Sequence, residues 1–359
     1  MDKKSSKNIQ NKKSRKENGM KVKAVVFEKL NEICVRDVEL PELEENQILA
    51  RSIYTFVSPG TELRTLEGHY GASEKFPFVP GYSVISRVEK VGSNAKHFRV
   101  GDILANRSGG IFLDVEQCFG GQSSYHVYGD DPAQHVLLGH EEDFTDEELL
   151  PFAVTEVAAI SYRGVRLAEP VPGDDVLVIG QGMIGKFSAE FFRYHGGCVT
   201  VCDVDEGRLK EAARNGFSTV NLKDENAAEL LAVHAKLGFD IVVECSGSSA
   251  GVKTAYSQLR ALPKSKTTIY NKTLPKLVMQ ASYIEDVSIN PSIFFKAEGV
   301  QLITPYDRDF YDRKMVAELI RKKAIDVKDY IKNVFTADEI VGAYRKLQNH
   351  EISSAVFKW

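Results

Sequence analysis

A glycine-rich turn between an apolar run and a helical segment is the feature that most limits how this chain can fold. Gly180, Gly182 and Gly185 form a G-x-G-x-x-G pattern directly after the apolar run 176–179, and a helix-like segment follows. In such a turn the first glycine permits a tight bend, the second lets backbone approach a pyrophosphate, and the third lets helix and strand pack closely. The residues predicted to contact a dinucleotide phosphate are Gly180, Gly182, Met183, Ile184 and Gly185.

An acidic residue ends the next apolar run. Asp203 lies close to the ~20-residue offset at which a carboxylate binds the ribose 2′-hydroxyl of NAD. A carboxylate there repels a 2′-phosphate, so NAD(H) is favoured over NADP(H). The alternative is a structural turn in which Asp203 caps the next helix. Ser246 follows the apolar run 241–243, and we expect it at the same ligand-binding edge, because ligands sit beyond the carboxyl ends of parallel strands.

Strand-like and helical segments alternate from residue 176 onward, which predicts an α/β fold with a doubly wound parallel sheet of the Rossmann type. The predicted strands are 176–179, 199–201, 241–243 and 267–270, and the predicted helices are 184–195, 206–215 and 227–237. Residues 22–143 instead carry short apolar runs broken by Gly and Pro, which is typical of a β-rich, barrel-like domain. The change between these two sequence patterns falls near Thr145, which is a predicted helix N-cap followed by three acidic residues.

We therefore expect residues 151–299 to form the nucleotide-binding domain. Residues 21–150 and 300–359 form the other domain, to which the final strand, 354–357, returns. The first twenty residues, with seven Lys or Arg, are expected to be a disordered basic tail.

Composition excludes several classes of protein. With 359 residues, 43% of them hydrophobic and 27% charged, the chain is typical of a globular protein. It has no apolar stretch of the roughly 20 residues that a membrane span needs. Its basic tail is read as a solvated run, so we expect neither a membrane nor a nucleic-acid partner. Five scattered cysteines without a C-x-x-C pair argue against disulfides and favour a cytoplasmic setting.

Several motifs in the same order carry a family resemblance. They are 59–62 (Pro-Gly-Thr-Glu), 76–82 (Phe-Pro-Phe-Val-Pro-Gly-Tyr), 91–92, 100–102 and the glycine turn. With them the chain resembles the medium-chain dehydrogenase/reductase superfamily, which implies a GroES-like catalytic domain beside the Rossmann domain. Within the superfamily the chain is similar to the branch that contains bacteriochlorophyllide a dehydrogenase, an enzyme that oxidises a secondary hydroxyl group with NAD. The residues that carry this similarity are 60–62, 79–82, 118–121 and 358–359. The resemblance also implies a homodimer, through an edge strand near 286–289.

The chain departs from the zinc enzymes of that superfamily. Pro59 stands where they have a ligand cysteine, Tyr82 where they have a ligand histidine, and the third ligand region near Phe152 offers no cysteine. The four-cysteine structural zinc lobe is also missing, since only Cys118 lies between residues 102 and 143. Neither a closed nor an open zinc site can be assembled from such residues, so we predict an enzyme without zinc.

Without a metal, another group must stabilise charge on the substrate oxygen. Tyr82 is the first candidate, because a phenol can donate a hydrogen bond and relay a proton. The alternative is that Tyr82 only fills a cavity. Thr61 occupies the proton-relay position that the resemblance implies, and Glu62 is interpreted as a structural acid that pairs with an arginine.

Thr155 is expected to begin the helix nearest the nicotinamide, where it either contacts the cofactor or packs against the protein. His69, in a loop, is interpreted as solvated. The resulting hypothesis is a zinc-independent, NAD(H)-dependent oxidoreductase that interconverts a secondary alcohol and a ketone on a small-molecule sugar, cyclitol or larger metabolite. The alternatives are an enoyl or quinone reductase of the same fold and a non-catalytic dinucleotide-binding protein.

Overall fold

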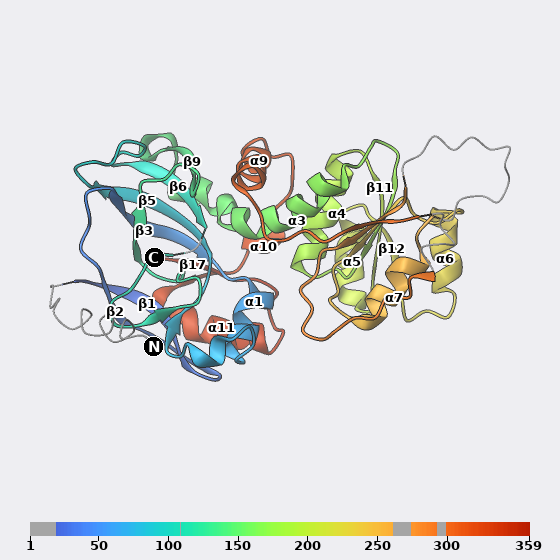
Figure 1. Cartoon of the computed structure of the whole chain (residues 1–359), viewed down its shortest axis with the longest axis horizontal. Helices are drawn as coiled ribbons and strands as arrows, with labels where there is room; N and C mark the ends of the chain where they lie inside the picture. Colours follow the sequence, from blue (N-terminus) through green and yellow to red (C-terminus); the bar gives the residue numbers. More distant parts are fainter. Residues whose placement is uncertain (1–18, 108, 261–273, 293–298) are drawn as a thin grey trace, which may run out of the picture. The chain divides into compact units, whose positions relative to one another are not determined.

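The structure, a computed structural model, describes residues 19–107, 109–260, 274–292 and 299–359 (Figure 1). It separates into two compact units, Met1–Ala153 with Lys328–Trp359 (unit 1) and Val154–Val327 (unit 2). The second boundary differs from the expected one at residue 300, because residues 301–303 add a strand to the sheet of unit 2. The predicted strand 267–270 and nearly all of the basic tail lie outside the described residues.

Unit 1 contains two sheets. The smaller has the order β2-β1-β4-β7, and the larger has the order β16-β17-β3-β5-β6-β9 with β8 paired to β3. Their strands are β1 (Met20–Lys29), β2 (Glu32–Leu40), β3 (Gln47–Phe56), β4 (Phe78–Val79), β5 (Ser83–Val91), β6 (Asp102–Arg107), β7 (Glu116–Gln117), β8 (Tyr125–Gly129), β9 (His135–His140), β16 (Val334–Thr336) and β17 (Val356–Lys358). Because β17 runs antiparallel to β3, with Val356 opposite Phe56, the predicted return of the last strand is confirmed.

The helices of unit 1 are short. They are α1 (Pro59–Leu66), α2 (Asp146–Leu149), α10 (Lys328–Ile331) and α11 (Ile340–Gln348), with 3-10 turns η2 (Ala72–Glu74), η3 (Glu141–Asp143) and η5 (Ala337–Glu339); a further turn, η4 (Leu150–Val154), ends one residue into unit 2. Thr145 caps α2 as predicted, since its side chain accepts the Glu148 N–H.

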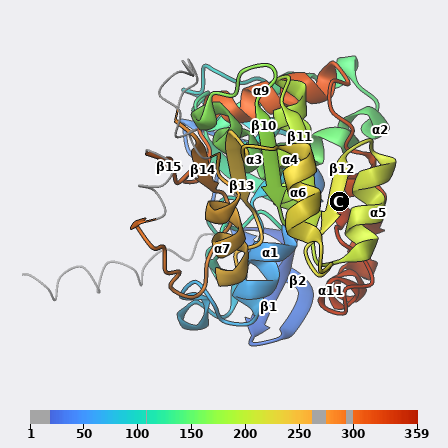
Figure 2. The same ribbon diagram turned by 90° about the vertical axis from the view of Figure 1, so that its right-hand side faces the viewer.

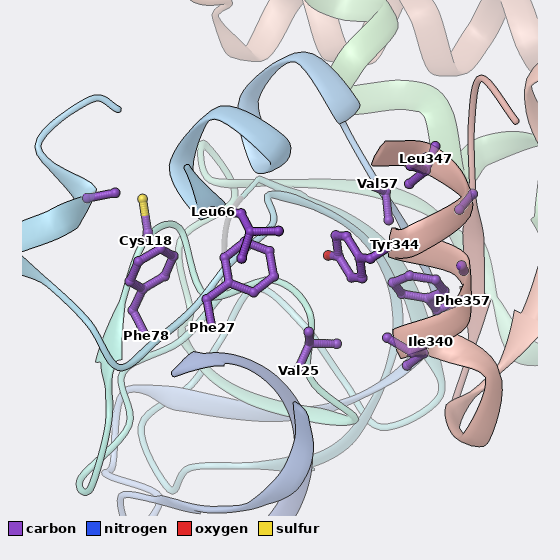
Figure 3. Close-up of a cluster of buried hydrophobic side chains, with 13 residues drawn as sticks. Val25, Phe27, Val57, Leu66, Phe78, Cys118, Ile340, Tyr344, Leu347 and Phe357 are labelled. Atoms are coloured by element: carbon purple, nitrogen blue, oxygen red, sulfur yellow. The ribbon is translucent and has the colours of Figure 1, made fainter. Parts of the chain in front are cut away.

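Helix α11 is held by aromatic packing. The Tyr344 ring projects from α11 into a buried cluster between Phe27 of β1 and Phe357 of β17 (Figure 3). The ring centroid of Tyr344 lies 5.4 Å from that of Phe27 and 5.6 Å from that of Phe357. Such contacts, which aromatic rings favour, fix the position of the Tyr344 hydroxyl inside unit 1.

Unit 2 is a parallel sheet with the order β12-β11-β10-β13-β14-β15 in its described residues. This is the strand order 3-2-1-4-5-6 of the doubly wound dinucleotide-binding fold, so the predicted fold class is confirmed. The strands are β10 (Asp175–Ile179), β11 (Cys198–Asp203), β12 (Ser218–Asn221), β13 (Ile241–Glu244), β14 (Lys276–Met279) and β15 (Gln301–Ile303).

The helices of unit 2 are labelled with its strands in Figure 2. They are α3 (Thr155–Ala168), α4 (Met183–Tyr194), α5 (Glu206–Arg214), α6 (Ala227–His234), α7 (Ser249–Ser257) and α9 (Phe310–Arg321). Leu231 of α6 and Val252 of α7 pack with Ile179 of β10 in one buried cluster, which is the apolar surface that a crossover helix must cover.

The segment 286–289, expected to be an edge strand for dimerisation, has no regular secondary structure. Val287 and Ile289 pack instead against the buried cluster of unit 2. The described sheet ends at β12 and β15, so the prediction of an edge strand at 286–289 is wrong. No helix among the described residues combines the length and apolar character that a bilayer crossing requires.

Candidate functional site

The glycine turn connects β10 to α4. Gly180 has φ +89°, and a side chain there would lie 2.8 Å from the Ser246 nitrogen. A side chain at Gly185 would lie 1.8 Å from the Gly180 oxygen, so this glycine is required for the helix and strand to meet. At Gly182, in contrast, nothing lies within 4 Å of the position that a Cβ would take. The space beside Gly182 is therefore open to a ligand.

The amino end of α4 faces this opening. Gly182 is its N-cap and provides no side-chain cap, while Met183 and Ile184 are half-buried in the first turn. The first N–H groups of a helix have no partner within the helix, and the helix dipole places positive potential there. The described geometry of residues 180–185 thus fits the phosphates of a dinucleotide.

Asp203 ends β11 beside the turn and is 5% exposed. Its Oδ1 accepts the N–H groups of Val204, at 2.7 Å, and Asp205, at 3.0 Å. Its Oδ2 accepts the Gln181 N–H at 2.6 Å and lies 3.5 Å from the Arg208 guanidinium. Since a carboxylate oxygen has two lone pairs, Oδ2 can accept a second hydrogen bond beside that from Gln181. The helix cap that we considered for Asp203 belongs to Asp205, which accepts the Arg208 N–H.

The loop after β13 forms the next part of this edge. Ser246 donates its hydroxyl to the buried carboxylate of Glu244, which also accepts the Gly247 N–H at 3.2 Å and the Tyr283 hydroxyl. Burial and the neighbouring Glu244 raise the pKa of Tyr283 well above its ordinary value. Glu244 therefore fixes the two loops that follow β13 and β14, and Ser246 reaches this edge with its hydroxyl proton already donated.

Helix α3 begins at Thr155, as predicted, and both Thr155 and Glu156 are buried. The Glu156 carboxylate lies 3.0 Å from Arg308 and 3.5 Å from Arg313, both of which are almost fully buried. A buried charge needs such partners, because removal from water is costly. This ion-paired cluster ties the start of α3 to the segment before α9, and it was not predicted.

Tyr82 lies just before β5 in unit 1 and is 5% exposed. Its hydroxyl donates to Ser58 Oγ at 2.7 Å. The ring packs edge-on against Phe119, with centroids 5.5 Å apart, and Phe119 is itself 46% exposed. Tyr82 is thus a buried phenol whose proton is directed to a serine hydroxyl.

Glu62 differs from its expected role. It is 1% exposed, and its carboxylate accepts from the Ser58 N–H at 2.9 Å, the Gln122 amide at 3.2 Å and the Tyr344 hydroxyl at 2.5 Å. Burial, outweighing these hydrogen bonds, raises the pKa of Glu62 to about 7. The prediction that Glu62 pairs with an arginine is wrong, because the partners that the structure shows are all uncharged.

Two other predicted residues lie in or just after helix α1. Thr61, in the first turn of α1, is half-buried, and its hydroxyl has no hydrogen bond to any residue within the described ranges. His69 is exposed, with its nearest charged neighbour, Glu67, 3.9 Å away, in agreement with a solvated loop residue.

The donors that a zinc ion needs are not found at the positions where the resemblance would put them. Pro59 has no donor atom, Tyr82 is occupied by Ser58, and Phe152 has an apolar side chain. No group of three or more His, Cys, Asp or Glu suited to a metal occurs among the residues that the structure describes. The described donor set therefore does not fit a zinc site.

Sequence reasoning missed Ser58, Gln122 and Tyr344. No local signal marks Gln122 or Tyr344, since Tyr344 is separated from Glu62 by 282 positions and Gln122 by 60. The serine at the start of α1 was the one detectable residue, because serine is a preferred helix N-cap.

Comparison with known proteins agrees with this architecture, although no family model matches the sequence. D-xylulose reductase of Morganella morganii is 28% identical over 255 residues, covering 64% of this chain and 73% of its own length. A protein of Escherichia coli CFT073 named as a short chain alcohol dehydrogenase, solved with NADH, has a TM-score of 0.78 at 16% identity, over 95% of this chain and 100% of its own. The chain has the medium-chain dehydrogenase fold.

A second solved structure has the same fold. A zinc-binding dehydrogenase of Sinorhizobium meliloti 1021, solved with NADP, has a TM-score of 0.76 at 18% identity, over 95% of this chain and 100% of its own. Sorbitol and L-threonine 3-dehydrogenases are also among the curated relatives. These matches support the medium-chain dehydrogenase/reductase superfamily and an oxidoreductase of alcohols.

Proposed function

We propose that the protein is an NAD(H)-dependent oxidoreductase that interconverts a secondary alcohol and a ketone without zinc, in the branch that resembles bacteriochlorophyllide a dehydrogenase. The observation that carries the proposal is the combination of an open glycine turn in unit 2 with a buried hydroxyl pair, Tyr82 and Ser58, in unit 1. The nicotinamide supplies or accepts the hydride when bound.

The residues that would hold the cofactor follow from the edge described above. The N–H groups of residues 182–185 would face its pyrophosphate, and Asp203 Oδ2 would accept a ribose hydroxyl. Ser246 and Thr155 are proposed as further contacts. NAD(H) is favoured because a 2′-phosphate would meet the Asp203 carboxylate, although Arg208, 3.5 Å from that carboxylate, is a cation that such a phosphate attracts.

The reacting oxygen is proposed to be stabilised by hydroxyl groups. Tyr82 would supply the proton in ketone reduction and take it back in alcohol oxidation, with Thr61 as an additional hydrogen-bond donor. Two features support a metal-free reaction: the donor-poor positions Pro59, Tyr82 and Phe152, and the lack of a ligand cluster among the described residues. The likeness to D-xylulose reductase and sorbitol dehydrogenase supports a sugar, polyol or cyclitol substrate.

A three-part experiment tests this function. NADH and NADPH are titrated by fluorescence, the purified protein is analysed for metals, and NAD-dependent turnover is measured on xylitol, sorbitol, inositol, L-threonine and 2,3-butanediol. We expect NADH binding, less than stoichiometric zinc and oxidation of at least one alcohol that persists with a chelator. Reduction of an enone or quinone alone would favour the enoyl or quinone reductase, and binding without any turnover would favour a non-catalytic protein.

A further inference from the structure

The direction of the hydrogen bond between Tyr82 and Ser58 leaves the Ser58 hydroxyl proton without an acceptor among the described residues. Tyr82 donates its hydroxyl to Ser58 Oγ at 2.7 Å, so the phenol proton is committed to the serine. The Ser58 proton itself has no acceptor within the described part of the chain. A buried donor without an acceptor costs free energy, so this proton is directed to a water or a ligand.

The position of Ser58 in the chain makes this arrangement unusual. Ser58 is the N-cap of α1, where a serine side chain normally accepts a helix N–H. Here its side chain makes no cap hydrogen bond, and its backbone oxygen accepts the N–H groups of Thr61, at 3.1 Å, and Glu62, at 2.8 Å. The Ser58 hydroxyl therefore does not cap the helix and is not used for that structural role.

Glu62 holds Ser58 in place. Its carboxylate accepts the Ser58 N–H, and is itself fixed by Gln122 of the 121–124 segment and Tyr344 of α11. The link is a backbone N–H, which does not release a proton, so Glu62 positions Ser58 and is not part of a proton path.

The surroundings suit an organic ligand. Ser58 and Tyr82 are 7% and 5% exposed, and the half-exposed ring of Phe119 packs against Tyr82. A hydroxyl donor beside an apolar wall is what a carbonyl or alcohol group on a carbon skeleton requires.

We propose that Ser58 is the catalytic residue that exchanges the proton directly with the substrate oxygen, and that Tyr82 acts behind it. The inference rests on the proposed function. In ketone reduction the carbonyl carbon gains the hydride that the cofactor supplies, and the π electron pair moves to the oxygen. That oxygen takes the Ser58 proton, Ser58 Oγ takes the Tyr82 proton, and water reprotonates Tyr82. Alcohol oxidation runs through the same transfers in reverse.

Kinetics of a mutant cycle test the order of the two hydroxyls. The variants are Ser58→Ala, Tyr82→Phe and the double variant, assayed on the alcohol that the unaltered enzyme oxidises fastest, with Ser52→Ala as the control. Ser52 is a buried serine of β3 whose hydroxyl donates to the Ser123 oxygen. We expect each single variant to lose about 100-fold in kcat with unchanged NADH affinity, and the double variant to lose no more, because both hydroxyls serve one transfer.

Two kinetic results would overturn the inference. One is full activity of Ser58→Ala. The other is losses that multiply in the double variant, which would mean that the two hydroxyls act separately.

A chemical test does not depend on turnover. Ser58→Cys and Ser52→Cys are treated with iodoacetamide in the folded state, and alkylation is followed peptide by peptide by mass spectrometry. We expect the thiol at position 58 to react at least tenfold faster than the thiol at position 52, and saturating NADH with substrate to slow it. Equal, negligible labelling at both positions would show that Ser58 does not face a ligand-accessible space.

The two tests separate the two proposals. If the unaltered protein turns over no alcohol or ketone, the proposed function fails, whereas the labelling still decides whether Ser58 is open to small molecules. If turnover is observed and Ser58→Ala is fully active, only the inference about Ser58 fails.

Discussion

Replacing Glu62 with glutamine is predicted to remove one contribution to the pH dependence of stability of unit 1, the loss of stability as the pH rises through about 7. Glu62 is 1% exposed and is surrounded by uncharged donors, so burial raises its pKa from the ordinary 4.5 to about 7. Above that pH the folded protein must hold a desolvated carboxylate without a cation. Glutamine keeps the size and an acceptor oxygen but cannot ionise.

The sign and size of the effect follow from proton linkage. Between pH 4.5 and about 7 the folded state binds a proton that the unfolded state has released, so the free energy of unfolding falls as the pH rises. The contribution of Glu62 is complete below the unfolded pKa and is lost as the pH passes the folded pKa. Since one pKa unit corresponds to about 1.4 kcal/mol, the full change is about 3 kcal/mol.

The chain provides its own reporter for this measurement. Trp359 is the single tryptophan and lies in unit 1, where its indole N–H donates to Thr55 Oγ1 at 2.9 Å. Urea unfolding followed by tryptophan fluorescence at pH 5, 6, 7 and 8 therefore reports on the unit that contains Glu62. We expect the free energy of unfolding of Glu62→Gln, relative to that of the unaltered protein, to rise by about 2 to 3 kcal/mol between pH 5 and pH 8, because pH 5 already lies above the unfolded pKa.

The matched control is Glu74→Gln, which changes an exposed glutamate of the same unit. Its difference from the unaltered protein should stay constant with pH. If Glu62→Gln behaves in the same way, the pKa of Glu62 is not raised and burial does not dominate its environment.

Three further predictions concern ligand binding and turnover. Asp203→Asn should raise the affinity for NADPH relative to NADH at least tenfold in fluorescence titrations, because Arg208 loses its carboxylate partner. Adding Arg208→Ala should cancel this gain in NADPH affinity. A cofactor preference that neither substitution changes would contradict the role of Asp203. Gly182→Ala should weaken NADH binding with little change in Tm. Gly185→Ala should instead lower Tm by several degrees, because its Cβ would lie 1.8 Å from the backbone oxygen of Gly180. Thr61→Ala should lower kcat without lowering Tm, because its hydroxyl has no hydrogen bond within the described residues; unaltered kcat would exclude Thr61 from the reaction.

The glycine turn after β10 and the position of Asp203 at the end of β11 could be predicted because their determinants are local. A glycine at φ +89° and a second glycine packed against it leave a direct trace in the sequence, and the acidic residue follows at the end of the next strand. The same holds for Thr145, whose cap needs only the residues of its own turn. The boundary at residue 300 was misplaced because a three-residue strand, β15, has no periodicity long enough to detect.

The parallel sheet of unit 2 and the return of the last strand to unit 1 could be predicted from the sequence alone, since backbone conformation and hydrophobic periodicity are properties of short segments. The contacts of Glu62 and Tyr82 became known from the folded structure. Tyr344 reaches Glu62 across 282 positions because aromatic packing fixes α11, and Ser58 meets Tyr82 because a helix start and a strand start converge. The partner of a buried polar group is set by which side chains packing brings within hydrogen-bond reach, and no local pattern encodes that.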